Sequence, residues 1–220
     1  PSMAGVSDLT YDRLVPDDLD GIDLAFVALP SGEAMTIIPA LRGRVRKIID
    51  LGGDFRLQSV ELYEQYYKHH HTAAELLPSA VYGLPELNRT SIAAADLVAN
   101  PGCYPTSAIL PLLPALTHGI VAANGIVINS LSGVSGAGRS ATVEMSFSEI
   151  NENVRAYKIG THQHIPEIES VLSVAAGGPV SASFVPHLIP ITRGIYTTIH
   201  ADLCVTLSEQ ELMTLYQDFY

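Results

Sequence analysis

The residues best suited to chemistry surround Cys103, in the heptapeptide NPGCYPT of residues 100–106. Residues 95–99 are typical of a short buried strand, and residues 107–116 form an apolar run typical of a helix. The cysteine is therefore expected where a strand becomes a helix, and there unpaired backbone N–H groups and the positive end of the helix dipole favour an anion. We expect this thiol to ionise more easily than an isolated one and, with Gly102 allowing a tight turn, to act as a nucleophile. The alternative is a small structural cysteine buried among apolar side chains.

Two histidines lie in the heptapeptide HQHIPEI of residues 162–168, whose proline and glutamate are typical of the first turn of a helix. A thiolate that attacks an acyl group needs a partner that exchanges a proton near neutral pH, and an unperturbed histidine can do so. A histidine just ahead of a helix is more often a surface or capping residue. Residue types alone therefore leave the roles of His162 and His164 open.

The charge balance restricts the partners. Among 220 residues there are 12 Lys and Arg against 23 Asp and Glu, a formal net charge of −11. This argues against a nucleic-acid or anionic membrane partner, because both attract basic proteins. Arg56 is informative because it follows an expected strand at 46–51, and ligands of doubly wound sheets bind at the carboxyl ends of the strands. A solvated loop arginine is the alternative.

The cysteines and clustered histidines do not follow a metal-binding pattern. Cys103 and Cys204 are far apart in the chain, which indicates neither a disulfide framework nor a zinc site and fits a reducing compartment. The histidines at 69–71 are adjacent, and adjacent side chains do not converge on one ion, so we expect a solvated helix end and no metal. With no 18-residue apolar run and no signal-peptide charge pattern, the sequence predicts a soluble, cytoplasmic protein.

Strand and helix patterns alternate in the first half of the chain, which predicts an α/β protein. A continuous apolar run at 21–30, a helix at 34–41 and the strand at 46–51 make one crossover unit of a doubly wound parallel sheet, with the first strand buried on both faces. Residues 178–184 and 194–205 instead alternate as the strands of an antiparallel sheet do, with Cys204 in the core.

A glycine-rich loop at 132–139 follows an expected strand at 125–131. Its many backbone N–H groups suit a phosphate or a closely approaching cofactor ring. Its spacing is not that of the dinucleotide fingerprint GxGxxG, and a plain flexible loop is the alternative. A capping-box pattern at 208–211 predicts the start of the last helix.

Six motifs, in chain order, resemble those of the N-acetyl-gamma-glutamyl-phosphate reductase family, the arginine-pathway relatives of aspartate-semialdehyde dehydrogenase. The heptapeptide around Cys103 strongly resembles the active-site signature of that family. The other five lie at residues 49–57 (IDLGGDFRL), 82–87 (YGLPEL), 132–139 (SGVSGAGR), 162–168 (HQHIPEI) and 186–195 (PHLIP followed by RGI). The resemblance covers the chain from about residue 23 to residue 220.

The resemblance implies the fold of the semialdehyde dehydrogenases. Residues 1–102 are expected to be the remainder of a dinucleotide-binding domain with an incomplete doubly wound, Rossmann-like parallel sheet. Residues 103–220 are expected to be an α+β catalytic and dimerisation domain with a mainly antiparallel sheet. The amino-terminal dinucleotide-binding segment and the carboxyl-terminal end of the family are expected to be missing from this sequence.

The reaction implied by the resemblance is the NADPH-dependent reduction of N-acetyl-glutamyl 5-phosphate to N-acetyl-glutamate 5-semialdehyde, with release of phosphate, in arginine biosynthesis. Cys103 would attack the acyl phosphate and form a thioester that accepts a hydride. NADP(H) would be the cofactor, a small acyl phosphate the substrate, and the protein a homo-oligomer, either a dimer or a tetramer.

Residue roles also follow from the resemblance. The expected catalytic residues are Cys103, His164, His162 and Glu167. His164 is the first choice for the acid and base and His162 the second, and Glu167 is expected to orient His164. Three residues are expected to bind the substrate: Arg56 its phosphate, Arg193 its carboxylate, and Asn100 beside them. The expected cofactor-binding residues are Pro30, Ser135, Gly136 and Gly138.

Three alternatives to this reading stay open. The chain could be another acyl-phosphate or semialdehyde dehydrogenase of the same superfamily. A cysteine hydrolase or acyltransferase would share the nucleophile and histidine but need no nicotinamide. A fragment without competent cofactor binding would carry the chemical residues alone, because the glycine-rich turn and helix that hold the pyrophosphate are expected to be missing.

Overall fold

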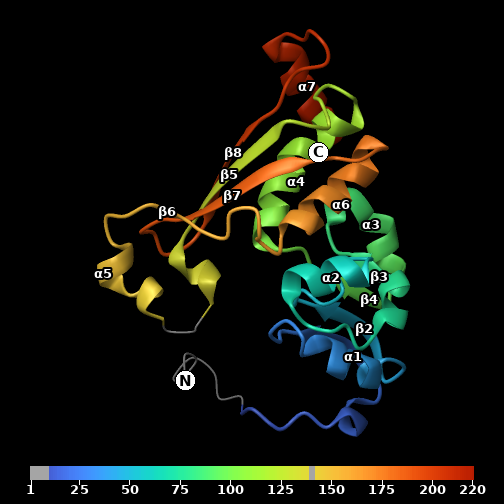
Figure 1. Cartoon of the computed structure of the whole chain (residues 1–220). Coiled ribbons are helices and arrows are strands. Elements are labelled where there is room, and N and C mark those ends of the chain that lie inside the picture. Colours follow the sequence, from blue (N-terminus) through green and yellow to red (C-terminus); the bar gives the residue numbers. More distant parts are fainter. Residues whose placement is uncertain (1–9, 139–141) are drawn as a thin grey trace.

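The computed structural model describes residues 10–138 and 142–220, which form two β-sheets covered by helices (Figure 1). Each sheet has its own cluster of buried apolar side chains. The predicted α/β class, with a parallel sheet and a second sheet, is confirmed. Arg139, at the end of the glycine-rich loop, lies outside the described residues, as do residues 1–9.

The first sheet is wholly parallel, with the strand order β1-β2-β4-β3. Its strands are β1 (Ile22–Val27), β2 (Val45–Asp50), β3 (Ala80–Tyr82) and β4 (Leu97–Ala99). Helix α1 (Ala34–Leu41) makes the predicted crossover from β1 to β2. Helix α2 (Val60–Tyr67) precedes β3, and helix α3 (Pro85–Ala94) connects β3 to β4.

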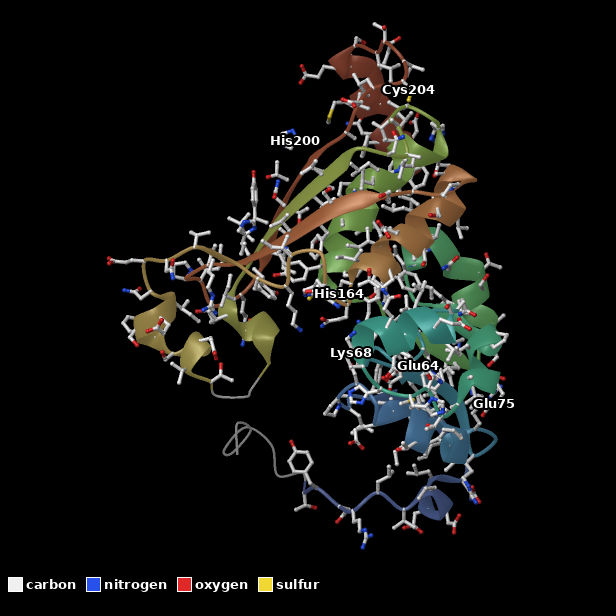
Figure 2. All side chains as sticks on the ribbon, in the orientation of Figure 1. Glu64, Lys68, Glu75, His164, His200 and Cys204 are labelled. Atoms are coloured by element: carbon white, nitrogen blue, oxygen red, sulfur yellow. The ribbon has the colours of Figure 1, made fainter. Side chains whose placement is uncertain are left out.

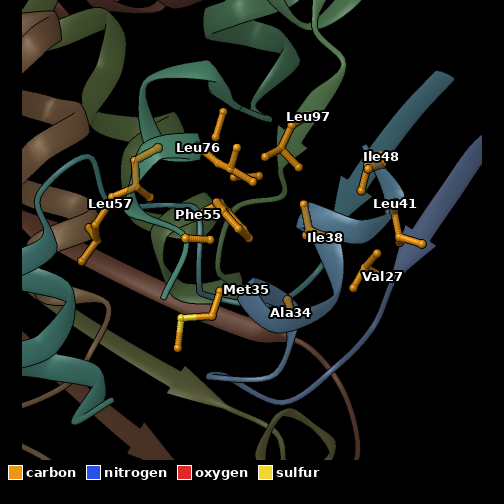
Figure 3. Packing of buried hydrophobic residues seen from close by; sticks show 14 of the residues in the cluster. Val27, Ala34, Met35, Ile38, Leu41, Ile48, Phe55, Leu57, Leu76 and Leu97 are labelled. Atoms are coloured by element: carbon orange, nitrogen blue, oxygen red, sulfur yellow. The ribbon is translucent and has the colours of Figure 1, made fainter. Parts of the chain in front are cut away.

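The core of this unit lies between the sheet and its helices. Figure 3 shows the side chains of α1 facing those of the strands and of the loop after β2. The members labelled there are Val27, Ala34, Met35, Ile38, Leu41, Ile48, Phe55, Leu57, Leu76 and Leu97. Because the strands are parallel, their carboxyl ends meet at one edge, where the N–H of Asn100 donates to the carbonyl of Asp50.

Strand β1 differs from the prediction of burial on both faces. Ile22, Leu24 and Phe26 are 41%, 42% and 63% exposed. The reason is that β1 lies at the edge of the sheet. Among the residues that the structure describes, it pairs only with β2. The apolar run that predicted burial is therefore uncovered on one face.

Asp54 fixes the loop that follows β2. Its carboxylate accepts hydrogen bonds from the backbone N–H groups of Gly32 and Met35 and from the hydroxyl of Tyr63, at 2.7 to 3.1 Å. Its carbonyl lies 2.8 Å from the Nε2 of His71. The prediction of a solvated helix end at 69–71 is therefore wrong for His71, which is 4% exposed and packs on this loop.

Among the residues that the structure describes, no three His, Cys, Asp or Glu side chains come together as metal ligands would. His70 is exposed and pairs with Glu64, its Nδ1 lying 2.6 Å from a carboxylate oxygen. The three adjacent histidines thus point to different surroundings, as the side chains of neighbouring residues must.

The second sheet is mixed, with the order β6-β7-β5-β8. Its strands are β5 (Ile126–Ser132), β6 (Arg155–Ala156), β7 (Ala182–Leu188) and β8 (Ile195–His200). The β5–β8 and β6–β7 pairings are antiparallel, as predicted for most of the sheet, whereas β5 and β7 run parallel. Helices α4 (Cys103–Thr117) and α6 (Ile165–Ala176) cover one face and enclose the second core.

Cys204 is exposed, so its prediction as a core residue is wrong. Strand β8 ends at His200, and the chain then leaves the sheet, held by the N–H of Cys204 donating to the carbonyl of Ile120. Figure 2 shows Cys204 near α7, at the opposite end of the second sheet from His164. The prediction failed because the alternation of apolar and polar residues in the sequence continues past His200, where the strand ends.

Helix α4 begins at Cys103, four residues before the predicted start, and so includes the cysteine in its first turn. Pro111 and Pro114 lie inside it. Because Pro114 has no N–H, the carbonyl of Leu110 loses its helical donor. The hydroxyl of Tyr220 donates to that carbonyl, so the terminal helix compensates for the proline.

The remaining helices are α5 (Phe147–Ile150) and α7 (Glu209–Phe219). The predicted capping box is confirmed: Ser208 accepts from the N–H of Glu211, and the Glu211 carboxylate accepts from the N–H of Ser208. In the described part of the chain, no helix combines the length and apolar character needed to cross a bilayer.

Replacing Asp54 by alanine is expected to destabilise the first unit. The change leaves three donors, the N–H groups of Gly32 and Met35 and the Tyr63 hydroxyl, without their acceptor. A loss of roughly 3 kcal/mol in the free energy of unfolding is expected, measured by urea denaturation. Asp23→Ala is the control, because its ion pair with Arg46 joins side chains that are 81% and 79% exposed and such pairs contribute about 0.5 kcal/mol. Equal losses in the two variants would contradict this account.

Candidate active site

Cys103 lies between the end of β4 and the body of α4. Gly102 is the N-cap residue, with φ −66° and ψ 155°, and Cys103 is the first helical residue and is exposed. The predicted position at a strand-to-helix turn is confirmed. The predicted ease of ionisation is not: although the residue as a whole is exposed, partial burial raises the pKa of the Cys103 thiol above its ordinary value. The backbone N–H groups of Tyr104 and of Cys103 itself lower this pKa, but by less.

A cavity of about 310 Å³ opens beside the sulfur. It joins the first turn of α4, the end of β5 with its glycine-rich loop, and the segment before α6. Its lining consists of Cys103, Tyr104, Ser132, Gly136, Tyr157, Lys158, His162, Gln163, His164 and Leu188. The structure therefore brings the predicted nucleophile, both histidines and one glycine of the loop to a single site.

His164 is in close contact with the turn that carries the cysteine. A Cβ atom on Gly102 would lie 2.6 Å from the Nε2 of His164, closer than van der Waals contact allows. The glycine is therefore required for this approach. The Nε2 atom also lies 3.5 Å from the Nη1 of Arg56. Burial, followed by the neighbouring charges of His162 and Arg56, lowers the pKa of His164 to about 2, so its ring is neutral.

His162 supports the neighbouring histidine. Its Nδ1 accepts a hydrogen bond of 3.1 Å from the backbone N–H of His164, and its ring packs edge-on against Tyr104 and Tyr157. Burial and the charge of Lys158 lower the pKa of His162 to about 4. Neither histidine has the near-neutral pKa that the sequence suggested, because both rings are enclosed by aromatic and apolar side chains.

Glu167 does not hydrogen-bond His164, so the prediction that it orients this histidine is wrong. It is 1% exposed, and its Oε1 accepts from the N–H of Gly102 and from the Tyr82 hydroxyl, both at 2.8 Å. It lies in the first turn of α6, which faces the start of α4 rather than the imidazole. Its carboxylate acts on the cysteine turn.

Arg56 is buried behind the site and does not line the Cys103 cavity. Its side chain is 9% exposed, and it donates to the carbonyls of Asn100 and Leu51, at 2.7 and 3.1 Å. Its Nη1 is 3.6 Å from the Oε2 of Glu167. The guanidinium therefore ties together the ends of β2 and β4 and borders His164.

The other predicted binding residues lie around the cavity without lining it, apart from Gly136. Asn100 is half-buried, and its side-chain amide donates to the carbonyl of Pro101. Arg193 is exposed, in the turn between β7 and β8 that packs on Gly133. Pro30 is exposed beyond the end of β1. Ser135 and Gly138 are exposed in the glycine-rich loop, whose Gly138 has a φ of 85°.

Sequence reasoning missed several residues that line the cavity. Tyr104 and Tyr157 share a hydrogen bond of 2.8 Å between their hydroxyl groups, and burial raises the pKa of Tyr157. Lys158 brings a positive charge to the cavity, and its φ of 45° is rare for a residue with a side chain. The available signal was the pair Tyr157-Lys158, only a few residues before the histidine motif.

Comparison with known proteins gives two family matches. Residues 103–220 match the profile described as the semialdehyde dehydrogenase dimerisation domain, and residues 1–95 match the one described as the semialdehyde dehydrogenase NAD binding domain. A curated relative from Pelotomaculum thermopropionicum, named N-acetyl-gamma-glutamyl-phosphate reductase, is 49% identical over 100% of this chain and 64% of its own length. The chain thus spans slightly less than two thirds of that relative.

Solved structures resemble the fold at low sequence identity. Aspartate semialdehyde dehydrogenase from Francisella tularensis superposes with a TM-score of 0.65 at 12% identity, over 94% of this chain and 65% of that one. The enzyme of the same name from Candida albicans, solved with NADP, gives a TM-score of 0.58 at 12% identity, over 89% of this chain and 54% of that one.

The neutral histidines predict a specific pH dependence of stability. In the unfolded chain a histidine has a pKa of about 6.5, whereas burial lowers that of His164 to about 2. Below pH 6.5 the unfolded chain therefore binds the additional proton, and the folded state loses stability as the pH falls. His164→Asn removes this loss, so its free energy of unfolding relative to the parent should rise by about 2 kcal/mol between pH 7.5 and pH 5.

The measurement is urea denaturation of parent and variant at several pH values. His69→Asn, at an exposed position after α2 and outside the cavity, is the matched substitution. A stability difference between parent and His164→Asn that stays constant with pH would show that the imidazole takes up its proton over the same pH range in the folded chain as in the unfolded one.

Proposed function

Because the chain belongs to the semialdehyde dehydrogenase family, we propose that it carries out the NADPH-dependent reduction of N-acetyl-glutamyl 5-phosphate to N-acetyl-glutamate 5-semialdehyde, with release of phosphate. This reaction is a step of arginine biosynthesis. The names of the relatives, 47 to 49% identical in several bacteria, support this substrate. The observation that carries the chemistry is the common cavity of Cys103 and His164.

The first step is transfer of the acyl group to sulfur. The Cys103 sulfur attacks the carbonyl carbon, the carbon–sulfur bond forms, and the bond from carbon to the phosphate oxygen breaks. His164 takes the thiol proton and passes it to the departing phosphate. A thiol with a raised pKa needs such a base, and the neutral imidazole can accept a proton without first losing one.

The second step returns the sulfur to its starting state. The nicotinamide cofactor, when bound, supplies the hydride that the thioester carbon accepts. The carbon–sulfur bond then breaks, the aldehyde leaves, and the Cys103 thiolate is reprotonated through His164. A thioester suits this step because its carbonyl accepts a hydride more readily than that of an oxygen ester.

We propose that the negative charge that develops on the acyl oxygen during attack is stabilised at the start of α4. The N–H groups of Cys103 and Tyr104 are in the first turn of the helix, where no helical acceptor reaches them. Pro105 has no N–H, and that of Gly102 is bonded to Glu167. The N–H groups of Cys103 and Tyr104 are therefore the proposed oxyanion donors.

We assign the anionic ends of the substrate to the cationic side chains around the cavity. Arg56 borders His164 and is proposed to bind the phosphate, with Asn100 beside it on the cysteine turn. Arg193, whose turn packs on the glycine-rich loop, is proposed for the substrate carboxylate, since its planar guanidinium can bind two oxygens. Lys158 adds positive charge inside the cavity itself.

The residues present fit the nicotinamide end of NADP(H). Gly136 lines the cavity, and a Cβ atom there would lie 3.0 Å from the Ser132 hydroxyl, so a larger residue would reduce the space beside the sulfur. Ser135 and Gly138 are exposed on the same loop, and Pro30 lies at the carboxyl edge of the parallel sheet, where dinucleotides bind in such folds. These four residues are the proposed cofactor contacts.

We further propose that the protein forms a dimer or tetramer through its second sheet. The face away from α4 and α6 exposes Tyr196 by 69% and Val127 by 36%, as an interface would. The proposed division into a cofactor unit of residues 1–102 and a catalytic unit of residues 103–220 is supported by the two cores, although Leu84 belongs to the second core. Two exposed free thiols, Cys103 and Cys204, support a reducing, cytoplasmic location.

Acylation of Cys103 tests the proposed chemistry without requiring the cofactor. With N-acetyl-glutamyl 5-phosphate alone, the chain should release about one equivalent of phosphate, because the thioester has no hydride to accept. The peptide that contains Cys103 should gain the mass of one N-acetylglutamyl group, removed by hydroxylamine. Addition of NADPH should convert the adduct to the semialdehyde, measured by absorbance.

Cys103→Ser should abolish the adduct and the aldehyde, whereas Cys204→Ser, on the remote exposed cysteine, should leave both unchanged. Continued release of phosphate without NADPH would instead indicate an acyl-phosphate hydrolase. An adduct on a residue other than Cys103 would exclude the proposed nucleophile.

A further inference from the structure

A set of buried and partly buried side chains, none of which lines the cavity, holds the turn before Cys103. It consists of Glu167, Tyr82 and Arg56, and we call it the turn clamp. Glu167 comes from α6 over the second sheet, whereas Tyr82 ends β3 and Arg56 follows β2 in the first unit. The clamp therefore joins the two units at the residue that precedes the cysteine.

The Oε1 atom of Glu167 carries both hydrogen bonds of the clamp. It accepts from the N–H of Gly102 and from the hydroxyl of Tyr82, each at 2.8 Å. Gly102 is the N-cap of α4, so its position fixes that of the first helical residue, Cys103. A carboxylate at this end of a helix is also favoured by the helix dipole.

The geometry fits an ionised Glu167. Its Oε2 is buried with no hydrogen-bond acceptor for a proton, and it faces the Nη1 of Arg56 at 3.6 Å. Burial raises the pKa of this carboxyl, while Arg56, the N–H of Gly102 and the Tyr82 hydroxyl oppose that rise. Burial is the main cause of the raised pKa of the Cys103 thiol; the charge of Arg56 lowers this pKa, and the negative charge of Glu167 raises it by a smaller amount.

We propose that Tyr82 and Glu167 are positioning residues for the nucleophile: they hold the Gly102 N–H so that the Cys103 sulfur faces the cavity, and the Glu167 charge adds to the effect of burial in disfavouring the thiolate. This inference rests on the proposed role of Cys103. Glu167 thus acts through the turn and not through His164, and Tyr82 acquires a role that its position in the sequence did not suggest. Removing either side chain releases the turn, but only a change at Glu167 also removes the charge.

Two measurements on the whole chain test the turn clamp without substrate or cofactor. The first is hydrogen exchange of the backbone amides in residues 100–106, which should be about tenfold faster in Tyr82→Phe, because a hydrogen bond to Glu167 is lost. It should also be faster in Glu167→Gln, because the amide oxygen of glutamine is a weaker acceptor for the Gly102 N–H than the carboxylate is. The second is the rate of Cys103 alkylation by iodoacetamide as a function of pH, followed by mass spectrometry. In Glu167→Gln the midpoint of this profile should move down by about half a pH unit, because a like charge has been removed.

The chain offers two internal controls. Tyr63 is buried, whereas Tyr82 is half-buried, but the hydroxyl of Tyr63 also donates to a carboxylate, that of Asp54 at 2.7 Å. Tyr63→Phe therefore removes a similar bond that does not involve Gly102. It should leave exchange in residues 100–106 and the alkylation midpoint unchanged. Cys204 is exposed and remote, and its alkylation reports any general loosening of the chain.

The proposal is overturned if neither clamp variant accelerates exchange in residues 100–106, if Tyr63→Phe accelerates it equally, or if Glu167→Gln leaves the alkylation midpoint in place. Should Glu167→Gln fail to fold, the exchange measurement on Tyr82→Phe alone decides the anchoring role. A Cys103→Ser variant that still made aldehyde would refute the proposed reaction but would leave these results unaltered, so the two failures can be told apart.

Discussion

The site depends on the close approach of His164 to Gly102. Nothing larger than a hydrogen atom fits between the Nε2 of the imidazole and the α-carbon of the turn, since a Cβ atom would lie only 2.6 Å from that nitrogen. On the other side of the same turn, Glu167 binds the Gly102 N–H. One glycine therefore sets how closely the histidine that precedes α6 approaches the helix that carries the sulfur.

Burial then decides the charge states. The chain has a net charge of −11, yet the cavity combines a thiol whose pKa is raised with two histidines whose pKa values are lowered, all mainly by burial. Both partners are therefore neutral at rest, and charges arise only when the thiol proton moves to the imidazole during attack on the substrate. An anionic substrate would bring its own charge to cations that surround the site, Lys158 within the cavity and Arg56 behind it.

Much of this could be predicted from sequence because the signals were local. The tight turn at Gly102, the crossover through α1 and the capping box at Ser208 each depend on neighbouring residues, and each is confirmed. The same holds for the motif order, which pointed to the semialdehyde dehydrogenase family.

The errors concern properties that depend on distant parts of the chain. The pKa values of Cys103 and His164 follow from burial by side chains of other elements, and the partner of Glu167 is 65 residues away in sequence. Cys204 and the outer face of β1 were predicted to be buried from an apolar pattern, but a pattern does not state where a strand ends or whether another layer covers it. Lys158 had no periodic signal, and only the cavity identifies it.

The most direct test of the account is the rate of Cys103 acylation by the acyl phosphate in Gly102→Ala. The backbone of Gly102, with φ −66° and ψ 155°, suits alanine, so the added methyl group acts only through its collision with His164 and the ring of Pro105. Gly178→Ala, where a Cβ atom would meet open space, is the matched control. We predict a loss of about 100-fold or more in the acylation rate of Gly102→Ala, because displacing the base from the nucleophile by about 1 Å has an effect of that size, and no loss in the control. Acylation of Gly102→Ala at the parental rate would contradict the claim that the contact between Gly102 and His164 organises this site.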